Sequence, residues 1–442
     1  MTVAAYEARM YQRLGLQPDA GRPAFEAAQS AHLAATVAQA RALSPFYRRR
    51  ADWPDAPFTG IADLPRLPFT TPDDLTRADP PLVAVSGGDV ARIVTLPTSG
   101  TSGPPKRVQF AAEDLEATAD YFHHGMAVFT SPGDRVAIAF AADRPASIGD
   151  GLAVALRRLG AIPLQIATAH DPQSLVVALR REAANIVAGP PVSLLAAARS
   201  SAADDGPPIR LKAVLVSSDH AAPSLKRAIA AAWHCEVYEH WGMTETGYGG
   251  AVDCAAHAGL HLREADLFVE VIDPATGEPL PPGREGEIVF TTLQPRATPL
   301  IRYRTGDRGC LVEGDCSCGS RLRRLAGLSG RIGDAAIVGD IRLTQAAIDD
   351  AVFAVDGVTD LDATLIAGSP ATLSLRIAAP PRYRIPVLGV AVRSAVAAVP
   401  QWAPAVAAGS LRVVVTLADA SLLQRTAKRR LRHEEDPCAN SG

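Results

Sequence analysis

The sequence predicts an α/β fold in which a large N-terminal domain with parallel and antiparallel sheets precedes a small α+β domain. Three observations predict this fold. Short β-branched runs alternate with helical segments from Arg92 onward, two strand signals joined by a Gly/Pro turn follow Asp253, and a β-α-β-β-α-β order follows Gly330. The chain has 442 residues, more than one ordinary core accommodates, so we expect more than one domain.

The N-terminal segment is predicted to be helical. Mixed apolar and charged periodicity over FEAAQSAHLAATVAQARAL indicates helices that end at the turn SPFY. The proline-rich stretch that follows, DWPDAPFTGIADLPRLPFTTPDDL, indicates short turns and helical caps.

The central segment alternates between strand and helix signals. RIVTLPTSG predicts a strand that enters a loop, and GLAVALRRLG predicts a helix. The further predicted strands are DRVAIAFA, AIPLQIAT, ANIVAGPP and LKAVLVSS. This alternation is typical of a largely parallel, doubly wound sheet. FVEVIDPATGEPLPPGREGEIVFTTL then predicts two antiparallel strands joined by a turn region.

The C-terminal segment predicts a compact domain of about 110 residues. Its elements follow the order IVGDIRL, TQAAIDDAVFAV, DATLIA, TLSLRIA, VLGVAVRSAVAAV and LRVVVTL, which we interpret as β-α-β-β-α-β. The last ten residues, HEEDPCANSG, are predicted to be a frayed tail.

Composition excludes several classes of partner. The 44 Lys and Arg residues nearly balance 47 Asp and Glu residues, so the chain lacks the positive field that holds nucleic acid. The start, MTVAAYEARMYQRLGL, has no apolar h-region, and no apolar run of about 18 residues follows. We therefore expect a cytoplasmic protein without a nucleic-acid or membrane partner.

Two of the six cysteines, Cys316 and Cys318, are separated by a single residue. A disulfide between such close residues is sterically poor. A reducing compartment also argues against a disulfide framework. Metal binding, redox chemistry and coincidence remain as the three explanations.

A glycine-rich segment, TLPTSGTSGPPKRVQF, is the most informative stretch of the chain. Gly100 and Gly103 let backbone N–H groups and hydroxyls converge on an anion, and Lys106 adds a positive charge. The Gly-Lys-Ser/Thr ending of a Walker A loop is absent. An ordinary polar loop is the alternative interpretation.

Two later segments favour the anion-binding interpretation over an ordinary polar loop. They are EHWGMTETGYGG, Glu239 to Gly250, and PLIRYRTGDRG, Pro299 to Gly309. With these three segments in this order, the chain resembles the adenylate-forming acyl- and aryl-CoA synthetases, and within them the phenylacetate–CoA ligase-like branch. SPFYRRR and LPRLPFTTPDDL are similar to the N-terminal signature of that branch, so the resemblance extends over nearly the whole chain.

The resemblance implies that the glycine-rich loop binds the β- and γ-phosphates of ATP. The residues concerned are Thr98, Ser99, Gly100, Thr101, Ser102, Gly103 and Lys106. A pyrophosphate leaving group needs many donors, and a mobile loop can release it after reaction.

The WGMTE motif is implied to bind the nucleotide. Trp241 takes the place of the family's usual tyrosine and would stack beside the adenine, and Gly242 and Met243 continue the motif. Thr244 would contact the α-phosphate, and Glu245 would bind Mg²⁺, a cation that prefers oxygen ligands.

Further nucleotide contacts follow from the same resemblance. Asp307 would accept hydrogen bonds from both ribose hydroxyls, and Ser218 and Asp219 sit where the family places a strand end against the adenine. For Asp219 a surface charge is the alternative. Arg331 would lie near the nucleotide, and Lys428 would bridge the carboxylate and the α-phosphate. A solvated basic face is the alternative for Lys428.

The resemblance also implies domains and a reaction. We expect an adenylation domain at residues 1–330, a hinge at 331–334 and a mobile C-terminal domain at 335–442. The reaction would activate a small, aromatic carboxylic acid as an acyl-adenylate with release of pyrophosphate, and then transfer the acyl group to coenzyme A. A homodimer fits the resemblance.

Two positions depart from the family pattern. Gly339 and Asp340 stand where the family has Arg-Gly, so Asp340 puts a negative charge where the pantetheine arm should pass. Ala427 replaces the glycine before Lys428. These departures motivate an alternative, an adenylating enzyme with a non-CoA acceptor or a stable adenylated product. A non-catalytic nucleotide-binding descendant is a third possibility, opposed by the retained lysine, glutamate and aspartate of the motifs.

In some relatives the resemblance extends to a cysteine and histidine set. Here the corresponding residues are Cys254, His261, Cys316 and Cys318, with His257 as the alternative histidine. Three thiolates and one imidazole form a closed tetrahedral set that is typical of structural Zn²⁺. Buried thiols without metal are the alternative.

Overall fold

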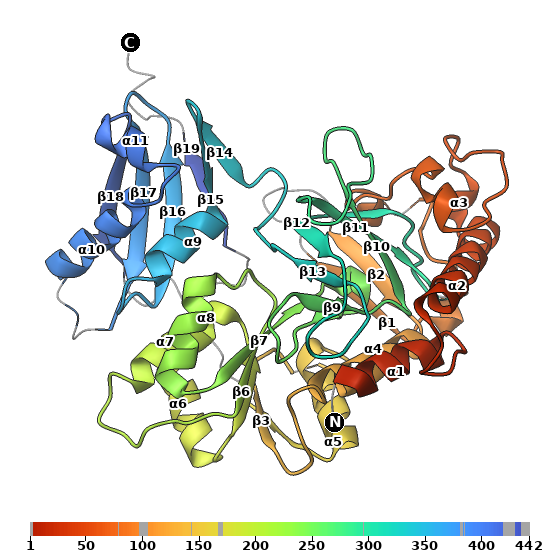
Figure 1. The fold of residues 1–442 in the computed structure, drawn as a ribbon, viewed down its shortest axis with the longest axis horizontal. Helices are drawn as coiled ribbons and strands as arrows, with labels where there is room; N and C mark the ends of the chain where they lie inside the picture. The colour runs from red at the N-terminus through yellow and green to blue at the C-terminus, as the bar shows by residue number, and fades with distance from the viewer. Residues whose placement is uncertain are drawn as a thin grey trace. The chain divides into compact units, whose positions relative to one another are not determined.

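The computed structural model describes residues 3–77, 79–96, 105–142, 144–166, 171–294, 296–380, 383, 385–418 and 429–434. The chain forms two compact units (Figure 1). Unit 1 comprises Met1–Asp134, Ala141–Pro163 and Tyr238–Leu328, and unit 2 comprises Arg135–Phe140, Leu164–Val237 and Ser329–Gly442. The functional boundaries at residues 1–330, 331–334 and 335–442 stay a prediction.

Unit 1 begins with three helices, α1 (Val3–Arg13), α2 (Arg22–Leu43) and α3 (Pro45–Arg48). The periodicity predicted a helix that ends at SPFY, and α2 confirms it, because Ser44 is extended and Pro45 starts a new turn. The buried positions of α2 recur every three or four residues: Phe25, Gln29, Leu33, Thr36, Val37 and Ala40.

The proline-rich stretch forms only short 3₁₀ helices, as its composition predicted. They are η1 (Ile61–Arg66), η2 (Asp74–Thr76) and, beyond the stretch, η3 (Gly87–Asp89). Two strands then form an antiparallel pair, β1 (Arg92–Leu96) and β2 (Lys106–Phe110). The pairing of Leu96 with Lys106 brings the two ends of the glycine-rich segment together.

Helices α4 (Ala112–Met126) and α5 (Ile148–Leu159) pack against each other in unit 1. The side chain of Ser147 caps α5 by accepting a hydrogen bond from the backbone of Asp150. Gly160 ends α5 at a φ of 79°, a left-handed conformation that suits glycine.

The sheet of unit 1 is antiparallel throughout and runs in the order β10-β11-β12-β13-β9-β8-β7. Its strands are β7 (Glu236–Trp241), β8 (Ala251–Val252), β9 (Leu260–Leu262), β10 (Leu267–Ile272), β11 (Gly286–Thr292), β12 (Tyr303–Val312) and β13 (Arg324–Ala326). The antiparallel pairing of β10 with β11 confirms the two strands predicted after Asp253.

A buried ion-pair network ties α2 to this sheet. The fully buried carboxylate of Glu264 accepts two hydrogen bonds of 2.7 Å from the guanidinium of Arg22. Arg323 donates its backbone N–H at 2.8 Å and its Nε at 2.7 Å to the same carboxylate. Burial acts to raise the pKa of Glu264, but the two arginines outweigh burial and lower that pKa from 4.5 to about 2.

The free energy of unfolding should therefore fall in acid, partly because Glu264 becomes protonated. The contribution of this carboxylate is present above pH 4.5 and is lost as the pH falls toward about 2, because the folded state binds the proton less readily. The shift corresponds to about 3 kcal/mol. Denaturant unfolding at pH 7 and pH 3 should show a smaller pH effect in Glu264→Gln than in the wild type.

The matched control is Glu26→Gln, because Glu26 also pairs with Arg22 but its side chain is 55% exposed. This variant should retain the pH dependence of the wild type. Equal loss of unfolding free energy between pH 7 and pH 3 in wild type and Glu264→Gln would contradict the assignment.

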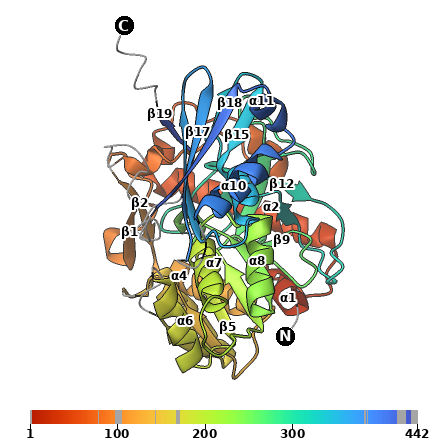
Figure 2. The same cartoon turned by 90° about the vertical axis from the view of Figure 1, so that its left-hand side faces the viewer.

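Unit 2 contains the predicted parallel strands. β3 (Arg135–Ile138), β5 (Ile186–Gly189) and β6 (Ala213–Val216) pair in parallel. The fourth strand that the alternation predicted, β4 (Ile162–Gln165), has residues in both units. Helices α6 (Pro172–Arg181), α7 (Pro191–Ser201) and α8 (Pro223–Trp233) lie side by side (Figure 2). All residues of β5 and β6 are buried, as expected of strands covered on both faces.

The C-terminal part of unit 2 follows the predicted β-α-β-β-α-β order, with additions. Its sheet runs β18-β17-β16-β19, and α9 and α10 pack against it (Figure 1). The elements are β14 (Ala335–Val338), β15 (Ile341–Thr344), α9 (Gln345–Phe353), β16 (Asp360–Ile366), β17 (Ala371–Ala378), α10 (Ile385–Ala397), α11 (Ala403–Ala407), β18 (Leu411–Leu417) and β19 (Arg432–Glu434).

Two details of the prediction for this part are wrong. IVGDIRL forms a hairpin, not one strand, because Val338 pairs with Ile341 across a two-residue turn. Gly339 opens that turn at a φ of 58°, which glycine adopts without strain. At the C-terminus, β19 includes His433 and Glu434 and pairs with β16, so these two residues do not belong to a frayed tail. Residues 435–442 lie outside the described part of the chain.

Among the described residues, no helix combines the length and the apolar character that crossing a bilayer requires.

Candidate active site

A tight turn follows β7 and carries the WGMTE motif. The motif continues into a short 3₁₀ helix, η4 (Thr244–Thr246). Thr246 Oγ1 accepts from the backbone N–H of Met243 at 3.1 Å and donates to the carbonyl of Met243 at 2.9 Å. Gly250 ends the turn. A Cβ atom added to this residue would lie 2.4 Å from the ring of Trp241, so only glycine fits here. The turn therefore fixes the direction of the Glu245 side chain.

Glu245 is the centre of a buried polar cluster within unit 1. Its side chain comes from η4, and its Oε1 atom accepts a hydrogen bond of 2.6 Å from Lys106 Nζ on β2. The hydroxyl of Tyr303, at the start of β12, donates to the same oxygen at 2.9 Å. The structure thus brings together Lys106, which the resemblance implies at the β- and γ-phosphates, and Glu245, which it implies at Mg²⁺.

The electrostatics keep Glu245 ionised. The residue is 6% exposed, and burial acts to raise the pKa of its carboxyl. The charge and hydrogen bond of Lys106, with the hydroxyl of Tyr303, outweigh burial and hold that pKa below its usual value. A buried, ionised carboxylate is a suitable ligand for a hard divalent cation.

Trp241 and Asp307 form a second contact of the candidate site. The indole Nε1 of Trp241 donates a hydrogen bond of 3.0 Å to Asp307 Oδ2. The backbone N–H of Asp307 donates to Thr305 Oγ1 at 2.9 Å. Trp241 is 6% exposed. Trp241, predicted to lie beside the adenine, therefore binds one carboxylate oxygen of Asp307, which is predicted to bind the ribose.

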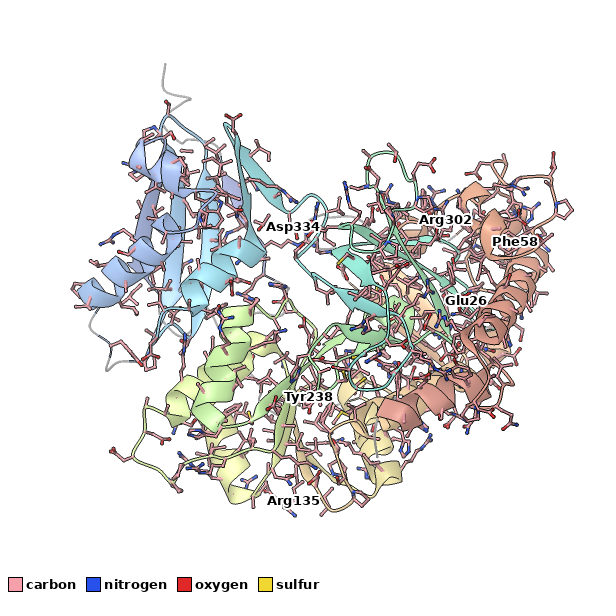
Figure 3. The ribbon with its side chains drawn as sticks, in the orientation of Figure 1. Glu26, Phe58, Arg135, Tyr238, Arg302 and Asp334 are labelled. Atoms are coloured by element: carbon pink, nitrogen blue, oxygen red, sulfur yellow. The ribbon has the colours of Figure 1, made fainter. Side chains whose placement is uncertain are left out.

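A buried arginine anchors the strand that carries Tyr303 and Asp307. Arg302 is labelled in Figure 3 and is 2% exposed, and its Nη2 and Nε atoms bind the carboxylate of Glu270 at 3.1 and 3.2 Å. Its Nη1 donates to the carbonyls of Pro65 and Leu67. These contacts fix the beginning of β12 to β10 and η1. The motif PLIRYRTGDRG contained Arg302 and Tyr303, but only Asp307 was predicted from it.

Two of the remaining predicted nucleotide residues lie in unit 2, after β6. Ser218 adopts a φ of 80°. Asp219 Oδ1 accepts from the backbone of His220 at 2.9 Å, and its Oδ2 lies 3.4 Å from Arg429 Nε. Arg429 also binds Asp349 through two hydrogen bonds of 2.8 Å. Sequence reasoning missed Arg429, although it immediately follows the predicted lysine.

Arg331, also in unit 2, is half-buried, and its carbonyl accepts a hydrogen bond of 3.3 Å from the backbone of Asp334. The phosphate-loop residues and the predicted C-terminal lysine lie outside the described residues: Thr98, Ser99, Gly100, Thr101, Ser102, Gly103 and Lys428. In the WGMTE turn, Gly242, Met243 and Thr244 are half-buried.

A cluster of three cysteines and one histidine lies elsewhere in unit 1. Its members are Cys254 after β8, His261 on β9, and Cys316 and Cys318 between β12 and β13, and one ligand atom of each lies within 4.8 Å of all the others. Cys254 Sγ is 3.7 Å from Cys316 Sγ, and Cys318 Sγ is 3.3 Å from His261 Nε2. These thiols are not bonded to each other.

Two distances in this cluster, 3.7 Å between Cys254 and Cys316 and 3.3 Å between Cys318 and His261, are close to those between the ligands of a tetrahedral zinc ion. Bonds of about 2.3 Å to sulfur and about 2.0 Å to nitrogen place neighbouring ligand atoms about 3.5 to 3.8 Å apart. The predicted alternative ligand, His257, instead directs Nδ1 to Asp253 Oδ2 at 2.7 Å. The geometry therefore favours His261.

Comparison with known proteins identifies the family of this chain. The family model described as AMP-binding enzyme matches residues 32–294, more than half of the chain. The phenylacetate-coenzyme A ligase of Thermus thermophilus is 29% identical over 346 residues, which cover 76% of this chain and 77% of the relative. The phenylacetate-coenzyme A ligase of Escherichia coli is 26% identical over 74% of this chain and 76% of the relative.

A solved structure supports the fold. The crystal structure of 2-hydroxyisobutyryl-CoA ligase in the postadenylation state, in complex with R3-HIB-AMP, aligns with a TM-score of 0.77 at 21% identity. The alignment covers 95% of this chain and 91% of that one. The likeness confirms the predicted α/β fold class.

Proposed function

Because the chain belongs to the AMP-binding enzyme family, we propose that it is an AMP-forming carboxylate–coenzyme A ligase similar to the phenylacetate–CoA ligases. In the first step the carboxylate of a small acid attacks the α-phosphorus of ATP, which forms an acyl-adenylate and releases pyrophosphate. The second step transfers the acyl group to the thiol of coenzyme A and releases AMP. The observation that carries the proposal is the buried Glu245 carboxylate, with Lys106 and Tyr303 on the same oxygen.

The chain's own residues position the nucleotide and the charge. Glu245 would hold Mg²⁺, which supplies charge neutralisation on the phosphate oxygens when it is bound. Lys106 Nζ now pairs with Glu245, and its flexible side chain would turn to the β- and γ-phosphates when ATP enters. Thr244, at the start of η4, would donate to the α-phosphate. The reaction needs no protein nucleophile, because the substrate carboxylate attacks phosphorus.

Trp241 and Asp307 would recognise the nucleoside. Asp307 accepts hydrogen bonds from the ribose hydroxyls in this proposal, and Trp241 fixes the carboxylate through Oδ2 while its ring lies beside the adenine. The remaining residues keep the roles that the family resemblance predicts. They are the glycine-rich loop Thr98 to Gly103, Gly242, Met243, Ser218, Asp219, Arg331 and Lys428.

The cysteine and histidine cluster would hold one structural Zn²⁺. Of its ligands, Cys254 comes after the turn that carries Glu245 in the sequence, and Cys316 and Cys318 come after the strand that carries Asp307. Four protein ligands leave no open position for water, so the ion would brace these segments and take no part in the reaction. Cytoplasmic location, a homodimer and the absence of nucleic-acid and membrane partners belong to the same proposal.

A second candidate function differs only in the acyl acceptor. Asp340 is exposed at the tip of the β14–β15 hairpin, where the family has a small residue before the pantetheine arm. A charge at this position favours an adenylating enzyme whose acceptor is not coenzyme A or whose adenylate is the product. Adenylation is common to both candidates.

The experiment that separates them uses the purified protein with ATP, Mg²⁺ and a panel of aromatic and aliphatic carboxylic acids. We expect pyrophosphate release with one class of acid, and thioester formation when coenzyme A is added. Pyrophosphate release without thioester would support the second candidate. An absence of pyrophosphate release with every acid would contradict both.

A further inference from the structure

Arg429, in unit 2, lies between two carboxylates from distant parts of the chain. Its side chain is 5% exposed, and its Nη1 and Nη2 atoms donate hydrogen bonds of 2.8 Å to the two carboxylate oxygens of Asp349 on α9. Its Nε atom lies 3.4 Å from Asp219 Oδ2, in the segment after β6. The guanidinium carbon is 5.1 Å from the centre of the Phe353 ring. One side chain therefore links α9 to the segment after β6.

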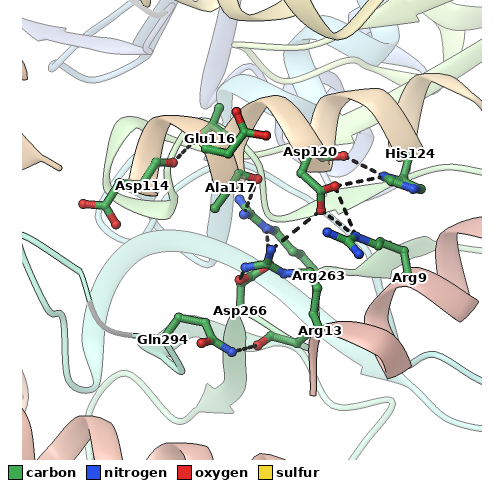
Figure 4. Close-up of polar contacts among 12 residues, drawn as sticks. Arg9, Arg13, Asp114, Glu116, Ala117, Asp120, His124, Arg263, Asp266 and Gln294 are labelled. Carbon is green, nitrogen blue, oxygen red and sulfur yellow. Dashed lines mark hydrogen bonds and ion pairs between the residues drawn. The ribbon is translucent and has the colours of Figure 1, made fainter. Parts of the chain in front are cut away.

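This link differs from the buried ion pairs of unit 1. In Figure 4, Asp266 binds Arg13 and Arg263, and none of these three residues was predicted to contact the nucleotide. Asp219, by contrast, belongs to the segment that is predicted to lie against the adenine. Arg429 directly follows Lys428, the lysine predicted to act in adenylation. The contact between Asp219 and Arg429 therefore joins two segments that the family resemblance assigns to the first step.

The two carboxylates hold Arg429 with different strength. Asp349 is fully buried, and its Oδ1 atom also accepts a hydrogen bond of 2.7 Å from Gln345 Nε2. Burial raises the pKa of Asp349 to about 6, against the effect of Arg429, so this carboxylate is ionised at pH 7. A buried carboxylate without its arginine is costly, which keeps Arg429 on Asp349. The side chain of Asp219 is 22% exposed and makes the weaker contact.

Two further hydrogen bonds connect the C-terminal part of unit 2 with the helices before it. The backbone N–H of Ser224, at the start of α8, donates to Asp350 Oδ1 at 2.7 Å. Arg199 on α7 donates from Nη2 to the carbonyl of Phe353 at 2.8 Å. Helices α8 and α9 also pack against each other. The exchange of the Ser224 N–H with solvent therefore reports whether this junction is closed.

We propose that Arg429 is a positioning residue for adenylation, which favours the closed junction between the predicted C-terminal domain (335–442) and the segment after β6 through its contact with Asp219. The inference rests on the proposed function, because a mobile C-terminal domain belongs to the two-step reaction. Arg429 and Asp349 both lie in that domain and move together, so the contact with Asp219 is the one that breaks. A partly exposed ion pair contributes little free energy, which lets the domain leave for the second step.

Hydrogen exchange of the full chain without ATP tests the contact independently of activity. Asp219→Asn keeps an oxygen that can accept from the backbone of His220 and removes the charge that faces Arg429, so exchange at Ser224 should become about threefold faster. Arg429→Met also leaves Asp349 buried without its partner, so a rise of at least about tenfold is expected. If Arg429→Met does not fold, Asp219→Asn decides. Mass spectrometry of peptides that contain Ser224 measures the exchange, and a rate equal to that of the wild type in the folded variants would overturn the proposal.

The two half-reactions separate positioning from general stability. Per folded molecule, Arg429→Met should lower the rate of pyrophosphate release about tenfold with an unchanged Michaelis constant for ATP, because fewer molecules hold the first arrangement. Transfer to coenzyme A from a chemically prepared acyl-adenylate should keep the rate of the wild type. Equal losses in both half-reactions would show a purely structural role and overturn the proposal.

Arg432→Met is the matched control. Arg432 lies on β19, pairs with Asp362 on β16 at 2.6 Å, and its side chain is 51% exposed. Both residues of this pair lie in the C-terminal domain, so the variant should keep the exchange rate at Ser224 and the rate of pyrophosphate release. If the wild type releases no pyrophosphate with any acid, the proposed ligase function fails, and the exchange at Ser224 alone decides whether Asp219 and Arg429 hold the junction.

Discussion

Glu245→Gln is expected to lower the rate of pyrophosphate release by about 10²- to 10³-fold at saturating acid. The amide keeps the size of the side chain and an oxygen that can accept from Tyr303, but it removes the negative charge that lies 2.6 Å from Lys106. A neutral amide is a poor ligand for Mg²⁺, and Lys106 loses its counter-charge. Steady-state assays of pyrophosphate release, with Mg²⁺-dependent ATP binding measured by calorimetry, check both effects.

Two comparisons isolate the charge. Tyr303→Phe removes one hydrogen bond to Glu245 and keeps the carboxylate, so we expect a loss of only about tenfold. Glu264→Gln changes another buried glutamate of unit 1, paired with Arg22 and Arg323, and should lower stability without changing the rate per folded molecule. A rate of Glu245→Gln within twofold of the wild type, with unchanged ATP binding, would show that this carboxylate does not act on the nucleotide.

The sequence predicted Lys106, Glu245, Trp241 and Asp307 one motif at a time, but it did not predict their contacts. Lys106 and Glu245 are 139 positions apart, and Trp241 and Asp307 are 66 apart. Trp241 and Asp307 lie on β7 and β12 of one sheet, whereas Lys106 lies on the separate β1–β2 pair and Glu245 on η4, so tertiary packing brings each pair together. Tyr303 illustrates the limit, because a tyrosine at the start of a strand looks like an ordinary core residue, and its contact with Glu245 depends on the register of β12.

Prediction from local sequence patterns failed at a glycine that forms a turn and at charged residues that are buried. The apolar run IVGDIRL indicated one strand, but Gly339 opens a two-residue turn, and the hairpin places Asp340 at its tip. Arg296 and Arg263 would be assigned to the surface from their type alone, and both are buried. Helix α2 was predictable because burial of one face dictates the spacing of its apolar residues, and β5 was predictable because burial of both faces gives a continuous apolar run.

Cys316→Ser is expected to release the zinc that the wild type should contain at one ion per chain. Structural zinc contributes its binding energy to folding, so we expect the free energy of unfolding to fall by at least about 3 kcal/mol. Cys316 is 4% exposed, and its Sγ lies 3.7 Å from that of Cys254, so a serine at this position leaves the remaining ligands without a closed set. Metal analysis of the purified protein and thermal unfolding with and without chelator measure the two effects.

Cys310→Ser is the matched control, because Cys310 lies on β12 in the same unit and its Sγ contacts the carbonyl of Ala326, outside the cluster. It should keep the zinc and most of the stability. A structural ion also predicts the order of losses in Cys316→Ser. At a temperature where the variant is still folded, its Michaelis constant for ATP should match the wild type, since Glu245 is held by Lys106 and Tyr303 and Asp307 by Trp241. A wild-type protein that is free of metal, and equally stable in chelator, would leave the four residues as packed thiols and a histidine.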